Sequence, residues 1–177
     1  ILAEYLDNDE DGRADDSAVV ESMVARRALL VMFGDTNELD ASNIFEAGVL
    51  DSYWVQDLQA DETAAPGRFD AALEETLHLI TTAGYEKVYP DAFGSQPGSR
   101  LTNAMDVARG GAFMSVPERY PDGSWYHYDD QTCSYQCMAV EYFYWALTSI
   151  LGGQSGPERC AEIAREWELC TSDAVRL

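Results

Sequence analysis

Lysine is almost missing from this sequence: Lys87 is the only one, and every other basic side chain is an arginine. Asp and Glu number 32 against 11 Lys and Arg, which gives a net charge of −21. Such a charge repels phosphate backbones and anionic lipids, so we expect no nucleic-acid partner and no membrane partner. It attracts cations, although an acidic shell that is simply solvated would also account for most of these side chains.

Long apolar runs and nucleotide-binding glycine loops are missing as well. No run of about 18 apolar residues occurs, which argues against a membrane-spanning helix. Neither standard phosphate-cradling glycine motif occurs, which argues against nucleotide chemistry. The sequence begins Ile1-Leu2-Ala3 without an initiator Met, from which we expect a processed or trimmed N-terminus.

Cysteine does not occur before Cys133 and then appears four times, at Cys133, Cys137, Cys160 and Cys170. An even number favours disulfides and a secreted, extracellular protein, and the spacings suit a zinc site poorly. If residues 157–170 form one regular helix, Cys160 and Cys170 lie about 15 Å apart along it. We therefore expect Cys170 to bond with Cys137 or Cys133. Local Cys133–Cys137 pairing is an alternative, as are four free thiols in a cytosolic protein.

Helical periodicity is the main secondary-structure signal. Capping residues and glycines bound the periodic segments, which predict helices over 17–33, 68–83, 100–109, 134–151 and 157–170. The segment 134–151 is the most apolar and should form the central buried helix. A break is expected at Pro66-Gly67, before the second helix.

These segments predict a mainly α, single-domain fold with long irregular loops. At most a minor β element is expected, around 111–128. A chain of 177 residues suits one domain. Within it, residues 1–16 would form a calcium-type loop and residues 17–177 the helical core.

The proposed calcium loop is the stretch DNDEDGRADD at residues 7–16. Acids occupy loop positions 1, 3, 5 and 9, and Gly12 occupies position 6. Alternating carboxylates converge on a hard cation, the glycine permits a tight turn, and a main-chain carbonyl adds an oxygen. Without a cation these acids would repel one another. The expected ligands are Asp7, Asp9, Asp11, the Arg13 carbonyl, Asp15 and Asp16.

This loop resembles the calcium loops of EF-hands and of related calcium-binding repeats over about ten residues. It departs at position 12, where an EF-hand has a bidentate Glu and this sequence has Ala18. Asp16 or Glu21 could supply the missing oxygens. The resemblance implies a bound Ca²⁺ with a structural role, and a solvated acidic tail is the alternative.

Only two histidines occur, and the first follows two glutamates. Glu74 and His78 are four residues apart and share a helix face, which Glu75 borders. The pattern resembles the His-Glu-x-x-His helix of zincin metallopeptidases, with Glu74 in place of the first His. That resemblance implies Zn²⁺ bound by Glu74 and His78, with Glu75 as the general base. Alternatives are the Glu-x-x-His pattern of ferritin-like bundles, whose second copy is missing, and a surface Glu–His pair.

A third zinc ligand is expected from the second half of the chain. Glu141 is a carboxylate in an otherwise apolar segment, where burial is costly unless the charge is paired or bound to a cation. Its place on a later helix is similar to that of the third ligand of gluzincins, and His127 is the competing candidate. A salt bridge from Glu141 to Arg109 is the alternative. Tyr126 or Tyr128 could donate to a developing oxyanion.

The sequence therefore predicts a secreted metal-dependent hydrolase, most specifically a zincin-like peptidase, that binds Ca²⁺ and Zn²⁺. The alternative is a calcium-stabilised extracellular binding module without catalysis, or a pseudo-enzyme. In that case the aromatic loop 113–128 (FMSVPERYPDGSWYHY) would bind a peptide, protein or glycan.

Overall fold

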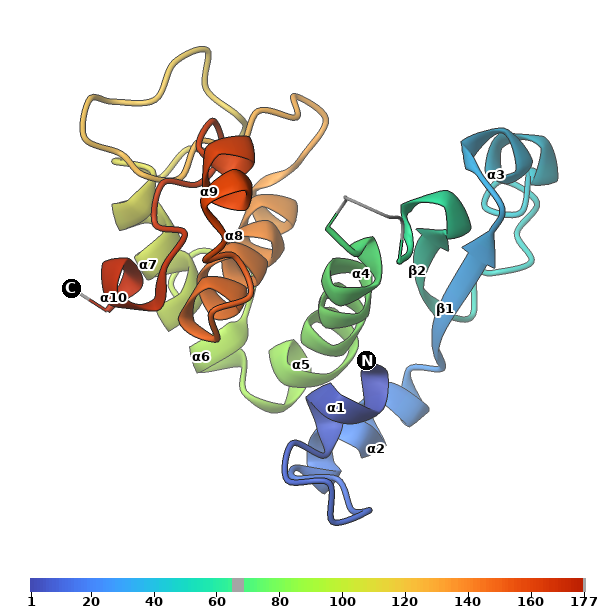
Figure 1. Cartoon of the computed structure of the whole chain (residues 1–177). Coiled ribbons are helices and arrows are strands. Elements are labelled where there is room, and N and C mark those ends of the chain that lie inside the picture. Colours follow the sequence, from blue (N-terminus) through green and yellow to red (C-terminus); the bar gives the residue numbers. More distant parts are fainter. Residues whose placement is uncertain (65–68, 177) are drawn as a thin grey trace. The chain divides into compact units, whose positions relative to one another are not determined.

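A computed structural model describes residues 1–64 and 69–176 of the chain (Figure 1). The described residues are mainly helical with one small sheet, which confirms the predicted fold class. They form two compact units, residues 1–88 and 89–177. The single-domain assignment stays a prediction. Among the described helices, none combines the length and the apolar character needed to cross a membrane.

The first unit combines helices with a two-stranded parallel sheet. Its elements are α1 (Leu2–Leu6), α2 (Ser17–Ala25), β1 (Ala28–Phe33), α3 (Thr36–Ser42), β2 (Trp54–Gln59), a 3₁₀ turn (Ala60–Glu62), α4 (Ala71–Ile80), a π-helical turn (Thr81–Tyr85) and α5 (Glu86–Val88). The strands pair in register from Ala28 opposite Trp54 to Phe33 opposite Gln59. Parallel strands require a crossover connection, and α3 lies within it. In Figure 1, α4 runs beside this sheet, which it contacts chiefly through β2.

The helix predicted over residues 17–33 is wrong in its second half. Helix α2 ends at Ala25 because Arg27 adopts a left-handed conformation with φ of 54°. An arginine gives no sequence signal for this conformation, which usually favours glycine or asparagine. The guanidinium of Arg27 lies 3.8 Å from the ring centre of Tyr53, just before β2. Tertiary contacts thus turn residues 28–33 into a strand of the two-stranded sheet. The minor β element expected around 111–128 appears as isolated bridges that pair Ser115 with Ser134 and Tyr126 with Trp167.

The core of the first unit joins α2 to the end of α4. Val19 and Met23 of α2 pack against Leu79, Ile80 and Ala83. The helix predicted over 68–83 does not end at Gly84, because a π-helical turn carries the chain through it. A β-carbon at Gly84 would lie only 2.7 Å from Cγ1 of Val19, so glycine permits this close approach. The expected break at Pro66-Gly67 lies outside the described residues.

The second unit is built around the long helix α8. Its helices are α6 (Pro90–Phe93), α7 (Arg100–Ala108), α8 (Tyr135–Ile150), α9 (Pro157–Ile163) and α10 (Ser172–Val175). The helices predicted over 100–109 and 134–151 are confirmed as α7 and α8. Serine side chains cap both, with Ser99 accepting from the N–H of Thr102 and Ser134 from that of Cys137. Residues 109–134 connect the two helices irregularly.

Two disulfides cross-link the second unit, Cys133–Cys137 and Cys160–Cys170. The expected bond from Cys170 to Cys137 or Cys133 is wrong. Helix α9 ends at Ile163, and the chain then turns so that the α-carbons of Cys160 and Cys170 lie 5.4 Å apart. The premise of one regular helix to Cys170 therefore failed, whereas the prediction of disulfide bonding is confirmed.

Candidate metal centre

The acidic loop between α1 and α2 folds around the carboxylate of Asp7. That carboxylate accepts hydrogen bonds from the main-chain N–H groups of Asp11, at 3.1 Å, and Gly12, at 2.9 Å. Gly12 has φ of +81°, a conformation that glycine adopts without strain. The N–H of Asp15 donates to the carbonyl of Leu6 at 2.8 Å and closes the loop. The glycine and the first aspartate thus act together to set the turn.

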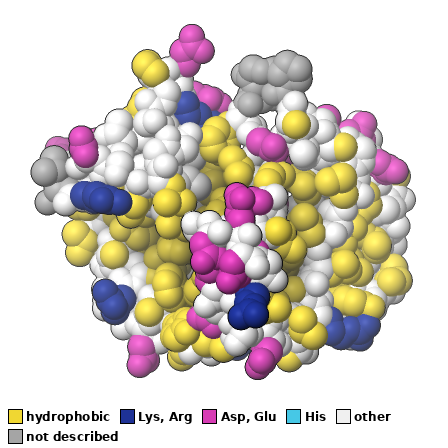
Figure 2. All heavy atoms as spheres, turned by 60° about the horizontal axis from the view of Figure 1, so that its bottom comes forward, with side chains coloured by type: hydrophobic (Ala, Val, Ile, Leu, Met, Phe, Trp, Pro, Cys, Tyr) yellow, Lys and Arg dark blue, Asp and Glu magenta, His cyan; other side chains and the backbone are white. Residues whose placement is uncertain are grey.

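Three of the predicted calcium ligands converge in this loop. Asp7, Asp9 and Asp15 each place a carboxylate oxygen within 4.8 Å of the others. Their charges repel one another, and a hard cation with oxygen ligands would relieve that repulsion. The loop lies at the bottom of Figure 1. Figure 2 brings this side forward, and acidic side chains gather in the centre of that view.

The other predicted ligands in the loop have different roles in the structure. Asp11 does not belong to the converging group, and its carboxylate accepts from the N–H of Arg13 at 2.9 Å. Asp16 is the N-cap of α2, where it accepts from the N–H groups of Ala18 and Val19. The sequence predicted Asp16 as a calcium ligand, and the structure uses its carboxylate as a helix cap. This cap connects the loop directly to α2.

Helix α4 presents Glu74, Glu75 and His78 as the sequence predicted. His78 is buried, with 5% of its surface exposed, so it does not form a surface pair with Glu75. Its Nδ1 lies 3.7 Å from Oε2 of Glu75. The same carboxylate oxygen accepts a hydrogen bond from Nε2 of Gln56 on β2. Gln56 thus orients the proposed base; the sequence offered no signal for this contact, which arises from packing of β2 on α4.

Tyr126 is not available as an oxyanion donor. Its side chain is fully buried, and its hydroxyl donates to the carbonyl of Met138 at 2.8 Å. Burial raises its pKa well above 10, and the charge of Glu141 adds to this effect. A hydroxyl committed to a buried carbonyl offers no open face to a substrate. Tyr128 is the alternative that the sequence provides.

The remaining candidates of the second unit are His127, Glu141 and Arg109. Nε2 of His127 lies 2.9 Å from the carbonyl oxygen of Ser124, and its Nδ1 lies 3.8 Å from a Glu168 oxygen. Both ring nitrogens thus face protein oxygens, which weakens the case for His127 as a ligand. Arg109 is fully buried and pairs with Asp106 at 2.6 Å, so a carboxylate other than Glu141 is its partner.

The complete zinc site stays a prediction. Glu74 and His78 belong to the first unit, and Glu141 and His127 belong to the second. Within the first unit alone, the structure supplies two ligands on one helix face and a carboxylate beside them. Two protein ligands fall short of the three that catalytic zinc sites use.

The aromatic loop 113–128 is packed on itself. The rings of Phe113 and Tyr120 meet edge to face at 6.0 Å, and Tyr120 lies 5.5 Å from the ring of His127. The hydroxyl of Tyr120 donates to the carbonyl of Tyr128 at 2.6 Å, and burial raises the pKa of Tyr120 to about 12. Met114 stands out with 63% of its surface exposed. The contacts of Tyr120 therefore connect the start of the loop, at Phe113, to its end, at His127 and Tyr128.

Comparison of the chain with protein-family models, with curated proteins and with solved structures finds no match.

Proposed function

We propose that this protein is an extracellular binding module whose first unit is stabilised by Ca²⁺. One observation supports the proposal above the others: the carboxylates of Asp7, Asp9 and Asp15 converge around a turn that Gly12 permits. Two disulfides support the extracellular location, because such bonds persist in oxidising surroundings.

The ligand set indicates a weak calcium site. Ca²⁺ takes six to eight oxygens, and three carboxylates with the carbonyl of Arg13 leave the remaining positions to water. No bidentate Glu follows at position 12, where Ala18 stands. Extracellular calcium modules have Kd values of about 10⁻⁴–10⁻³ M, and we expect an affinity in that range. A site of this strength is filled outside cells, where calcium is abundant.

Calcium would act on stability through α2. The converging carboxylates precede the Asp16 cap by one residue at their nearest, and α2 carries two core residues, Val19 and Met23. Bound Ca²⁺ would neutralise the carboxylates of the loop and so stabilise the first turn of α2, which contributes to the core. The aromatic loop 113–128 is our candidate for the binding surface, because a preformed surface loses less conformational entropy when it binds a peptide, protein or glycan.

Thermal melts with added CaCl₂ test the calcium proposal. At a calcium concentration of ten times Kd, a site that exists only in the folded state adds about 1.4 kcal/mol to the free energy of unfolding. Asp9→Asn and Asp15→Asn should each remove most of this gain. Asp61→Asn is the matched control, because Asp61 is exposed and lies outside the loop. Unchanged melting with EDTA and no calcium by elemental analysis would refute the proposal.

A metal-dependent hydrolase is the second candidate, favoured by the position of Glu75 beside buried His78 on α4. In this proposal Glu74, His78 and Glu141 hold Zn²⁺, which lowers the pKa of a bound water towards 7. Glu75, oriented by Gln56, accepts the proton of that water, and Tyr128 takes the donor role from Tyr126.

Zinc content distinguishes the two candidates. The hydrolase requires stoichiometric zinc that His78→Ala and Glu141→Gln remove. Glu75→Gln should retain the zinc and abolish hydrolysis, because it removes the base and not a ligand. Calcium alone, with no zinc retained after dialysis against zinc-containing buffer, would leave only the binding module.

A further inference from the structure

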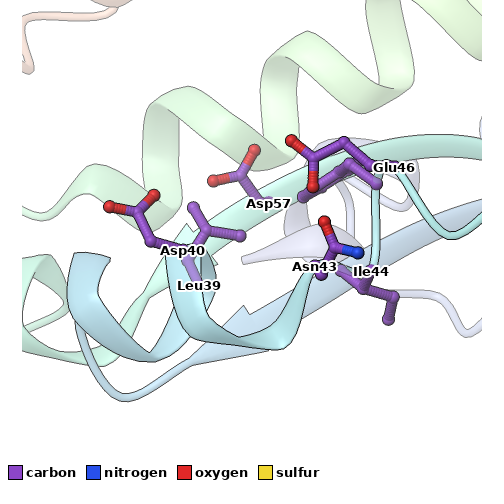
Figure 3. Close-up of a pocket in the computed structure, with 7 residues that line it drawn as sticks. Leu39, Asp40, Asn43, Ile44, Glu46 and Asp57 are labelled. Carbon is purple, nitrogen blue, oxygen red and sulfur yellow. The ribbon is translucent and has the colours of Figure 1, made fainter.

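A separate cavity, open to solvent on one side, lies in the first unit between α3 and β2, and of its lining Leu39, Ile44 and Asp57 are half-buried. Its volume is about 380 Å³, and it is lined by Leu39, Asp40, Asn43, Ile44, Phe45, Glu46 and Asp57. Figure 3 shows the carboxylates of Asp40, Asp57 and Glu46 on the same side of the chain, with that of Asp57 between the other two in this view. The amide of Asn43 points towards the same space. None of these residues takes part in the calcium loop or the α4 site.

The turn after α3 positions this lining. Asn43 ends α3 in a left-handed conformation with φ of 50°, and the chain then reverses through residues 44–52 towards β2. Leu39 and Asp40 come from the last turns of α3, and Asp57 comes from the middle of β2. Acidic and apolar residues from three segments of the chain thus line the cavity.

The cavity is better suited to an organic cation than to a metal ion. Metal ligands must lie within a few ångströms of one ion, and the acids of this cavity are not among the described carboxylates that converge within 4.8 Å. Its volume is instead at the lower end of the range for small-molecule sites, about 300–1,000 Å³. Leu39, Ile44 and Phe45 offer apolar contact that a hydrated metal ion cannot use.

The environment of Asp57 supports a cationic ligand. Burial raises the pKa of Asp57, and the nearby charge of Glu75 raises it further, so its ionised form is disfavoured in the folded protein. An ammonium group next to Asp57 would favour the ionised form again. No salt bridge to Asp57 occurs among the described residues that form such pairs.

We propose that this cavity binds a small aliphatic amine, with its ammonium group on Asp57, the charges of Asp40 and Glu46 acting at longer range, and its methylene chain against Leu39 and Ile44. The chain's net charge of −21 concentrates such cations near the surface. The cavity would select amines among these cations, because it pairs the ammonium charge with a carboxylate and also contacts the alkyl chain. This proposal does not rest on the calcium loop, and it shares with the α4 site only the charge of Glu75, which raises the pKa of Asp57.

Calorimetric titration of the full chain with 1,5-diaminopentane tests the proposal at about 0.15 M salt, where long-range attraction is screened. We expect saturable binding at one site. Asp57→Asn should weaken it at least about tenfold, since the neutral amide loses the charge-assisted hydrogen bond to the ammonium group. Asp61→Asn makes the same charge change on an exposed residue outside the cavity and should bind as the parent does.

Two further titrations test separately whether the charge and the alkyl chain of the ligand contribute to binding. 1-Pentanol should bind much more weakly, because it has the chain without the charge, and Leu39→Ala should weaken the diamine with all carboxylates kept. If Asp57→Asn does not fold, Asp40→Asn serves as the second carboxylate variant. Unsaturable binding that is equal in all variants would show general attraction to an acidic surface and would overturn the proposal. No binding, binding of the alcohol as tightly as the diamine, or displacement by stoichiometric Ca²⁺ would overturn it too.

Discussion

Replacing Gly84 with alanine tests the packing that joins α2 to the end of α4. The added β-carbon would lie 2.7 Å from Cγ1 of Val19 and 3.3 Å from Cγ of Met23. Val19 is fully buried, and a β-branched side chain in a helix has one strongly preferred rotamer. Rotating its methyl group away from the new β-carbon would therefore cost Val19 its preferred rotamer. The helices must separate or the side chain must leave its rotamer.

Two opposing effects decide the sign of this substitution. Overpacking a core costs about 1–3 kcal/mol, whereas alanine in place of a helical glycine gains about 0.5–1 kcal/mol. The steric effect is larger, so we expect Gly84→Ala to lower the free energy of unfolding by about 0.5–2 kcal/mol. For a chain of 177 residues, each kcal/mol lowers Tm by about 2–4 °C.

Urea denaturation of a double-mutant cycle gives the decisive measurement. Val19→Ala removes the methyl group that the new β-carbon would meet, so the cost of Gly84→Ala should largely disappear in that background. Val20→Ala is the matched control, because Val20 is the next residue of α2 and is not among the atoms nearest Gly84. A Gly84→Ala protein as stable as the parent, or a cycle with Val19 that is additive, would refute the close approach.

Three further predictions address the second unit and the cavity. Replacing Cys160 and Cys170 together with serine should cost about 2.7 kcal/mol, from the closure entropy of a ten-residue separation, and a non-reducing peptide map should recover this pair. Asp106→Ala should cost about 3–5 kcal/mol in denaturant unfolding, because it leaves the fully buried Arg109 without its carboxylate. Asp57→Asn should stabilise the protein at pH 7 and lose that advantage as pH falls below about 4. The pKa of Asp57 is raised on folding, so only its ionised form is a liability.

Neighbouring residues were sufficient to predict a helix where capping residues and glycines mark both of its ends. Helices α7 and α8 were predicted within a residue or two because serine caps precede them and glycines follow. Residues 28–33 were assigned to a helix because an apolar run has the same appearance in a short strand. Only the pairing of residues 28–33 with β2, which is distant in sequence, decides between a helix and a strand.

The candidate sites differ in the same way: some are formed by neighbouring residues and others by residues that are distant in sequence. The turn at Gly12 and the convergence of Asp7, Asp9 and Asp15 follow from neighbouring residues, and the sequence predicted them. The cavity between α3 and β2 was missed, because Asp40 and Asp57 meet there only through the crossover of a parallel sheet. The disulfide pairing failed for a similar reason, since the end of α9 at Ile163 has no glycine or proline to announce it.

The two halves of this chain are reinforced by different chemistry. Both disulfides lie in residues 89–177, and residues 1–88 contain no cysteine. A reducing agent therefore removes constraints from one unit alone, whereas the concentration of cations acts on the acidic loop of the other. We expect reduced protein to unfold in two separate transitions, so a single Tm would describe neither unit. Redox state would then set the folded fraction of residues 89–177, and cation concentration that of residues 1–88. Proteases would therefore cleave different segments in a reducing solution and in a solution without cations.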